Sequence, residues 1–135
     1  MPATARWTAR KIGLDGFSGS QINELDTNLL IGTNYLKLAL DEFGDSLPMA
    51  AAAYNAGPGR PRAWRAPGGS GPRLDGAIWV ENIPFMETRH YVKNVLANTV
   101  NYAAMLTGQP QSLKQRLGTI GPAAPDEVAR TKDLP

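Results

Sequence analysis

The stretch LPMAAAAYNAGPG, residues 47–59, decides the fold. The four consecutive alanines at 50–53 leave this segment without a polar face, and a helix that is apolar all round has to be covered on most sides. The sequence therefore predicts a short buried helix from Leu47 to Asn55, which the Ala-Gly-Pro-Gly turn at 56–59 ends. The rest of the chain must supply the elements that cover it.

Two longer helices are predicted, one on each side of this segment. Before it, small and apolar residues recur on one helical face: Leu29, Gly32, Leu36, Ala39, Leu40 and Phe43. We expect Asp26 to be the N-cap of this helix, Gly44 to end it, and Gly32 to let another helix approach closely. After the alanine segment, apolar residues recur in a similar way from Pro84 to Leu106, and Gly108 ends that helix.

Shorter elements fill the remainder of the chain. Spacing predicts three further helices, over residues 3–12, 59–65 and 113–117. The segment 75–82 fits either a short helix or an extended piece, 66–72 is expected to be an exposed loop, and the tail from Gly118 is expected to be flexible. Trp64 should point inward. Because no stretch alternates apolar and polar residues as a strand would, the fold class is mainly α, with five or six helices.

Length and composition restrict the possible functions. A chain of 135 residues is one ordinary domain. The absence of cysteine and the single histidine, His90, exclude disulfides, thiolate zinc sites and any mechanism that needs two imidazoles, so we expect no metal site. The net charge of +2 does not suggest a nucleic-acid partner. No apolar run approaches the roughly 18 residues of a membrane span, and the start of the sequence shows no signal-peptide pattern.

Positive charge is nevertheless concentrated in one part of the chain. Between Ser46 and Leu74 there is no carboxylate, but there are four arginines: Arg60, Arg62, Arg65 and Arg73. Such a basic loop could meet an anionic polymer or a peptide carboxylate, whereas the alternative is a loop that only keeps the surface hydrated. The sequence leaves both interpretations open.

Glu81 stands out among the carboxylates. Six others have ordinary explanations, three at a solvated helix end (Asp41, Glu42 and Asp45) and three in the tail (Asp126, Glu127 and Asp133). Glu81 lies within the apolar stretch IWVENIPF at 78–85, and a partly desolvated carboxylate has to be paired or its pKa rises. It is therefore either a glycan-binding or acid/base residue or a carboxylate that caps the helix at Pro84. Glu87, in the first turn of that helix, fits a favourable dipole interaction.

Tyr54 and Asn55 are the polar side chains at the end of the alanine-rich helix. An aromatic ring next to an amide is suited to a sugar, because the ring can cover a pyranose face while the amide binds a hydroxyl or acetamido group. The glycines that follow let backbone approach a ligand closely. A buried tyrosine beside a turn-forming asparagine would give the same pattern.

Five ordered motifs, taken together, carry a resemblance to a known family. They are MPATA at 1–5, DTNLLIGTNYL at 26–36, AAYNAGPGR at 52–60, WVENIPF at 79–85 and ETRHYVKNVLA at 87–97. In this order they closely resemble the C-terminal catalytic domain of the soluble lytic transglycosylases, over about residues 1–106. The resemblance implies a lysozyme-like, mainly α-helical fold with a long glycan-binding groove.

The resemblance also implies an activity and a location. Members of this family cleave the MurNAc–GlcNAc β-1,4 bond of peptidoglycan and leave a 1,6-anhydromuramoyl end, which makes them carbon–oxygen lyases. One glutamate serves as acid and then base, and no metal or other cofactor is needed. The implied partner is the peptidoglycan glycan strand, the implied location is the periplasm or cell envelope, and we expect a monomer.

The family's functional positions can be assigned to four residues of this sequence. Met1 matches a methionine that lines the groove, and Tyr54 matches the tyrosine that orients the catalytic acid or the acetamido group. Asn55 adjoins it, and Glu81 matches a groove glutamate that contacts sugar or peptide. Glu87 and Arg89 match residues that support the helix and the core, and His90 is expected to face solvent.

The catalytic glutamate of the family has no counterpart in this sequence. In the family it lies in a Glu-Ser motif upstream of a Gly-Leu-Met-Gln stretch, and the present sequence begins at the Met-Pro-x-Thr-Ala that follows. We therefore expect residues 1–108 to be a partial domain, incomplete at its N-terminus and marginally stable, and 109–135 to be a partly flexible extension. Three functions stay open: an inactive part of a transglycosylase, a non-catalytic peptidoglycan-binding module, or a hydrolase that uses Glu81 with water.

Overall fold

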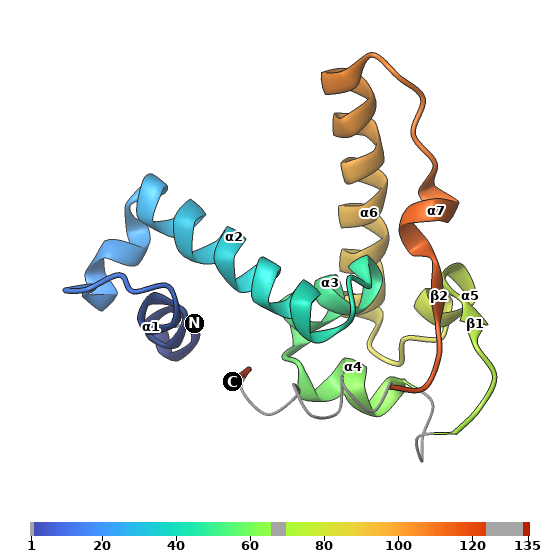
Figure 1. Ribbon diagram of the computed structural model, residues 1–135, viewed down its shortest axis with the longest axis horizontal. Coiled ribbons are helices and arrows are strands. Elements are labelled where there is room, and N and C mark those ends of the chain that lie inside the picture. Colours follow the sequence, from blue (N-terminus) through green and yellow to red (C-terminus); the bar gives the residue numbers. More distant parts are fainter. Residues whose placement is uncertain (1, 66–69, 124–133) are drawn as a thin grey trace.

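The computed structural model describes residues 2–65, 70–123 and 134–135, and it confirms that the chain is mainly α (Figure 1). Its elements are, in order, α1 (Pro2–Lys11), the 3-10 helix η1 (Gly19–Asn23), α2 (Leu25–Glu42), α3 (Leu47–Ala56), α4 (Gly59–Trp64), β1 (Leu74–Asp75), α5 (Gly76–Glu81), α6 (Met86–Thr107), α7 (Leu113–Leu117) and β2 (Thr119–Ile120). The described residues thus form seven α-helices, more than the five or six predicted, since 76–81 forms a helix of its own.

Helix α3 is the centre of the larger core, as the alanine run predicts. Met49 and the four alanines that follow it are buried, and α3 packs against α2, α4 and α6. Phe43, Val92 and Ile83 fill the space around it. Because alanine side chains are short, the neighbouring helices can lie close to the α3 backbone without leaving voids.

Helix α2 is turned further about its axis than the sequence pattern predicts. Its buried side chains include Ile31, Tyr35 and Ala39, whereas Leu29, expected on the buried face, is 54% exposed. Asp26 lies in the first turn of the helix rather than at the N-cap, which is Glu24. The prediction for its other end is confirmed, because Gly44 follows the C-cap Phe43 with a positive φ of 58°.

Residues 119–120 form strand β2 and join the core, whereas a flexible tail was predicted from Gly118; residues 124–133 of that tail lie outside the described residues. Strands β1 and β2 pair antiparallel, with Leu74 opposite Ile120, and Ile120 is buried against the α3 cluster. A strand of two residues is too short to show the alternation by which strands are recognised in a sequence. Gly76, just after β1, is required at its position, because a Cβ there would lie 2.2 Å from the carbonyl oxygen of Leu117.

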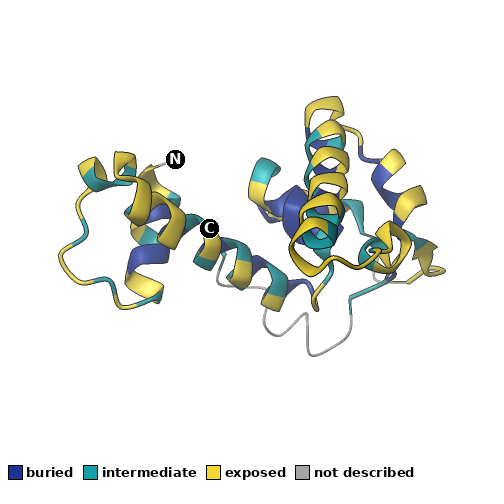
Figure 2. Cartoon of the chain, turned by 90° about the horizontal axis from the view of Figure 1, so that it is seen from above, coloured by how far each residue is buried: buried dark blue, intermediate teal, exposed yellow. Residues whose placement is uncertain are grey.

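Helix α1 lies at the far end of α2, away from α3 and α6 (Figures 1 and 2). It packs on α2 and η1, where Ala5, Ala9 and Ile31 form a second, smaller buried cluster. Leu14 and Phe17 pack against this cluster from the loop that follows α1. The molecule therefore has two apolar centres, which α2 joins.

Glu42 corrects the expectation that the carboxylates at the end of α2 are solvated. It is only 5% exposed, and both the Nε and the Nη2 of Arg62 donate to its Oε1, with an Nε–Oε1 distance of 2.7 Å. The guanidinium comes from α4, twenty residues further along the chain. This pair holds α4 against the end of α2.

Candidate functional site

A cleft of about 450 Å³ opens between α1, α2 and the C-terminal end of α3. Side chains from three directions line it, among them Thr4, Asn28, Tyr35, Tyr54, Asn55 and Arg60. One wall therefore belongs to the α3 core and the opposite wall to the smaller α1 cluster. Among its described lining residues the cleft has hydroxyl, amide and guanidinium groups but no carboxylate side chain.

Tyr54 projects from the end of α3 and is 37% exposed. Its ring packs against that of Tyr35, with centroids 5.7 Å apart and planes inclined by 58°. A Cβ at Gly32 would lie 3.1 Å from the Tyr54 hydroxyl oxygen, so Gly32 makes room for the tip of this side chain rather than, as was predicted, for the backbone of another helix. Because Tyr35 packs against one part of the Tyr54 ring, the exposed part of that ring is available to contact a ligand.

Tyr54 also borders a second hollow of about 230 Å³ between α2, α3 and α6. Leu29, Tyr91 and Val95 line this hollow, and Gly32 is shared by both. Burial raises the pKa of the Tyr91 phenol above its usual value, so that side chain stays neutral at physiological pH. Tyr54 thus stands between two adjoining hollows along the same side of α2.

Asn55 is held by a contact with α6. Its Oδ1 accepts a hydrogen bond of 2.7 Å from the Oγ1 of Thr88, a buried residue. The Nδ2 of Asn55 makes no hydrogen bond to any residue that the structure describes. The amide therefore has a fixed orientation and a remaining donor at the edge of the cleft.

Tyr35 lies between the cleft and the Glu42–Arg62 pair. Burial raises the pKa of its phenol above the usual 10.0, and the charge of Glu42 raises it further, against an opposing effect of Arg62. The phenol accordingly stays protonated at neutral pH. It supports the Tyr54 ring as a neutral aromatic group.

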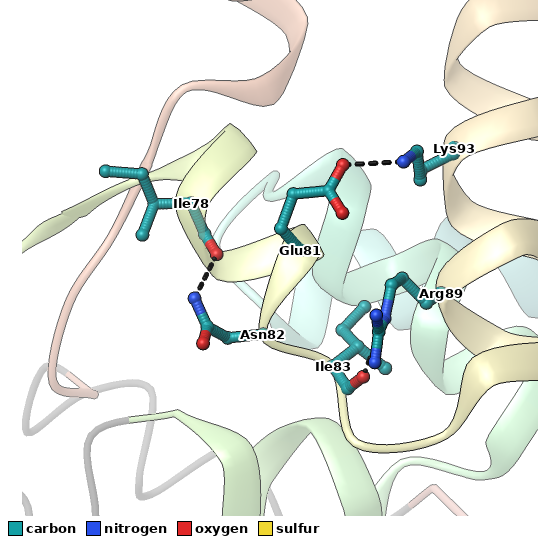
Figure 3. A network of polar contacts seen from close by, with 6 residues as sticks. All are labelled: Ile78, Glu81, Asn82, Ile83, Arg89 and Lys93. Carbon is teal, nitrogen blue, oxygen red and sulfur yellow. Dashed lines mark hydrogen bonds and ion pairs between the residues drawn. The ribbon is translucent and has the colours of Figure 1, made fainter.

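Glu81 lies outside this cleft, at the end of α5 (Figure 3). Its carboxylate accepts a hydrogen bond of 2.6 Å from Lys93 Nζ on α6, and this bond holds the pKa of Glu81 below its usual value. The expected desolvation is wrong, because Trp79, Val80 and Ile83 turn into the core while Glu81 turns outward. The cap at Pro84 is not formed either, since the carboxylate reaches Lys93 instead.

The residues that follow Glu81 support the fold. Arg89 Nε donates to the carbonyl oxygen of Ile83 at 3.0 Å, as expected of a residue that supports the core (Figure 3). Glu87 lies in the first turn of α6, where a negative charge is favourable, and His90 is exposed as predicted. Met1 lies outside the described residues, as do three tail carboxylates: Asp126, Glu127 and Asp133.

Three of the four arginines in the basic stretch serve the fold. Arg62 pairs with Glu42, Arg65 donates to the carbonyl oxygen of Gly121, and Arg73 bonds to Thr119. Arg60 differs, because its guanidinium carbon lies 4.4 Å from the centre of the Phe85 ring, at the cleft. Sequence reasoning placed Arg60 in a basic loop but missed its pairing with Phe85, which only the fold brings close.

The cleft offers no cluster of metal-binding side chains. Across residues 2–65, 70–123 and 134–135, no three histidine, cysteine, aspartate or glutamate side chains come together in a way that could hold an ion. Within the same residues, every helix is too short or too polar to cross a membrane.

Family comparison matches the sequence to two models. The transglycosylase SLT domain matches residues 1–73, which is more than half of the chain. The chain belongs to the SLT transglycosylase family. A second model, the soluble lytic transglycosylase helical domain, matches residues 82–111, the region of α6. The resemblance carried by the five sequence motifs is thereby confirmed.

Curated relatives of this SLT-family chain agree with that assignment. It is 44% identical over 111 residues to a soluble lytic murein transglycosylase of Escherichia coli K12, with 82% of this chain and 17% of the relative covered. A soluble lytic murein transglycosylase of Salmonella typhimurium is 46% identical over 114 residues, with 84% and 17% covered. The chain thus spans about a sixth of the length of these relatives.

Solved structures of lytic transglycosylases share the fold. An inactive mutant of a Pseudomonas aeruginosa lytic transglycosylase is similar with a TM-score of 0.75 and 41% identity, over 84% of this chain and 18% of that one. The 70 kDa soluble lytic transglycosylase of Escherichia coli gives 0.70 and 39%, over 87% and 18%. A complex of the 70 kDa enzyme with bulgecin A gives 0.69 and 39%, over 79% and 17%. The lysozyme-like fold expected from the motifs is confirmed.

Proposed function

We propose that this chain binds glycan strands of peptidoglycan in the cleft beside Tyr54, as part of a lytic transglycosylase domain. The observation that carries this proposal is the arrangement of a half-exposed tyrosine ring, a fixed amide and further polar groups around one cleft in a chain of the SLT family. A pyranose face can stack on the ring of Tyr54, while Asn55 and Asn28 can bind hydroxyl or acetamido groups. Tyr54 and Asn55 are thus proposed glycan contacts.

Cleavage requires a proton donor at the glycosidic oxygen, and the proposal assigns none to the 135-residue chain. No carboxylate side chain lines the described part of the cleft, and Glu81 lies outside it with a lowered pKa. A general acid has to hold its proton near neutral pH and to lie within hydrogen-bond reach of the leaving oxygen. Glycan binding with little or no turnover is therefore the activity proposed for this chain, whereas the full reaction gives 1,6-anhydromuramoyl ends.

The same observations disfavour a hydrolase that uses Glu81. A carboxylate that is paired with Lys93 on the surface is ionised at neutral pH, and Glu81 does not line the cleft beside Tyr54. The second candidate function is a non-catalytic peptidoglycan-binding module, which the same cleft without a carboxylate side chain also favours. The proposed location is the periplasm or cell envelope, where murein lies, and the proposed state is a monomer.

Two measurements test the proposed function. Purified peptidoglycan incubated with the chain should give no anhydromuramoyl or reducing-end products by mass analysis, while the chain should sediment with the insoluble peptidoglycan. A longer form of the protein that gains turnover would identify the chain as a part of an enzyme, and one that binds without turnover would identify a binding module. Efficient product formation by the chain itself would contradict the proposal.

The variant Tyr54→Ala tests the binding site. Loss of the ring should weaken binding about tenfold or more, because burying an aromatic side chain contributes roughly 1.5–3 kcal/mol. Tyr102→Ala is the matched control, since Tyr102 is an exposed tyrosine on α6 that does not line the cleft. Equal binding by Tyr54→Ala and the parent chain would place the glycan elsewhere.

A further inference from the structure

Arg60 is an exposed cation that the fold holds in a fixed place at the cleft. Its guanidinium lies over the Phe85 ring at 4.4 Å, and Phe85 packs edge-on against Trp64 with centroids 5.4 Å apart. The carbonyl oxygen of Trp64 in turn accepts a hydrogen bond of 3.2 Å from Nε1 of the buried Trp79. A continuous stack therefore connects the guanidinium to the core, which reduces the conformational freedom that a bound arginine would otherwise lose.

The charge of Arg60 has no counter-ion within the described residues. Arg62 is neutralised by Glu42, and Arg65 and Arg73 are bonded to carbonyl and hydroxyl oxygens, but Arg60 makes no ion pair with a described residue and lies over the Phe85 ring. No carboxylate side chain lines the described part of the cleft, and Pro135, the last residue of the sequence, also lines it, but its terminal carboxylate makes no ion pair with Arg60. A ring covers one face of the guanidinium and leaves its N–H edge for an acceptor.

We infer that Arg60 binds a carboxylate carried by the muramyl residue of the strand and thereby makes the cleft select charged over neutral glycans. This inference rests on the proposed function. The sugar backbone of peptidoglycan is neutral, and its negative charge comes from carboxylates at the lactyl group of muramic acid, either the free lactyl acid or the acids of the attached stem peptide. Arginine matches a carboxylate with two parallel N–H donors, which gives direction as well as charge.

The position of Arg60 relative to Tyr54 fits this role. Both residues line the same cleft, and Gly57 lies between them in sequence and also lines it. Gly57 has a φ of 82°, which turns the chain sharply after α3 and brings α4, with Arg60, back to the cleft. A sugar on the Tyr54 ring would therefore place its substituents within the same cleft as the guanidinium.

Calorimetric titration of the 135-residue chain with three tetrasaccharides of equal length tests the inference. They are a neutral oligomer of N-acetylglucosamine, a GlcNAc–MurNAc oligomer with free lactyl acids, and the same oligomer with stem peptides. We expect Arg60→Gln to weaken binding of a carboxylate-bearing ligand about tenfold and to leave the neutral oligomer unchanged. Arg60→Lys should recover only part of the loss, and added salt should reduce the preference of the parent chain.

Lys37→Gln is the control, because it removes one positive charge from an exposed site on α2 and should leave all three affinities unchanged. Preference for the free acid or for the stem peptide would each support the inference and would identify the source of the carboxylate. Equal weakening of all three ligands by Arg60→Gln, or no weakening at all, would overturn it. If the parent chain bound none of the three, the proposed function would fail first, so the two failures are distinguishable. Circular dichroism of each variant checks that it is folded.

Discussion

The two ends of α2 lie in apolar clusters of very different size. At its C-terminal end, Ala39 and Phe43 join a cluster that α3, α5, α6 and β2 also build. At its N-terminal end, the fully buried members are Ala5, Ala9 and Ile31. Since buried apolar area supplies most of the stability, the α1 end should open at a lower free energy than the α3 core. Because the candidate cleft has one wall in the α3 core and the other in the smaller α1 cluster, ligand binding requires the α1 cluster to be folded.

Removal of Arg62, beside the α3 core, should give the largest effect on the free energy of unfolding. The variant Arg62→Met removes the guanidinium that donates two bonds to the buried carboxylate of Glu42, and breaking such a buried ion pair costs about 3–5 kcal/mol of unfolding free energy. Urea unfolding followed by circular dichroism measures the loss. Lys37→Met breaks the exposed pair with Asp41 and should cost about 0.5 kcal/mol or less. Similar losses in both variants would show that the buried pair contributes no more than a surface pair.

Truncating one isoleucine in each cluster compares the stability of the two clusters directly. Ile83→Ala removes a fully buried side chain from the large cluster and should lower the global unfolding free energy by about 2–5 kcal/mol. Ile31→Ala acts in the small cluster, so hydrogen exchange should lose protection in α1 while α3 and α6 keep theirs. Simultaneous loss of protection in α1, α3 and α6 would mean that the two clusters unfold as one unit.

Alkaline pH should act on Tyr35, which lines the cleft from α2, the helix that joins the two clusters. Burial raises the folded-state pKa of Tyr35, so the folded protein holds the phenol proton more tightly than the unfolded chain. This contribution to stability is complete below the usual pKa of 10.0 and is lost as pH rises through the folded-state value. Tyr35→Phe should therefore lose less stability than the parent chain between about pH 9 and pH 11. The exposed Tyr102, changed to phenylalanine, is the control; an identical pH dependence in all three proteins would contradict the assignment.

The smallest effect is expected at Glu81, on the surface of the larger cluster. Its pKa lies below the usual 4.5 because Lys93 donates a hydrogen bond to it, so the stabilisation is present above that value and lost as pH falls through the folded-state pKa. Lys93→Gln should raise the pKa of Glu81 in an NMR titration and barely change the melting temperature. A pKa unaffected by this substitution would show that the pair is not formed in solution. Lys37→Gln should leave the Glu81 titration unchanged.

Local signals in the sequence predicted most of the fold. The alanine run predicts the buried helix α3, and Gly44 and Gly108 predict where α2 and α6 end. The small residue Gly32 predicts a close contact, which the Tyr54 hydroxyl makes. Each of these depends on a few neighbouring residues or on one face of one helix. The order of the motifs was enough to identify the family.

Features that depend on distant parts of the chain were not predictable in the same way. The burial of Glu42 follows from Arg62 on another helix, and the stack on Arg60 needs Phe85 from the start of α6. The orientation of Glu81 was misjudged because its apolar neighbours in sequence turn to the other side of α5. The roles of Tyr54, Asn55, Met1 and Glu81 toward glycan stay predictions.

The pairing of β1 with β2 has a practical consequence for work with this protein. It places Ile120 among the buried side chains of the α3 core. It also brings the end of α7 so close to Gly76 that a methyl group at this position would collide with the backbone of Leu117. A version shortened to end at Gly108 would uncover apolar surface on α5 and α6 and would tend to self-associate. Affinity tags, dyes and fusion partners should therefore leave residues 109–123 uninterrupted, and a peptide of residues 109–123 supplied separately offers a way to report on the folded state by complementation.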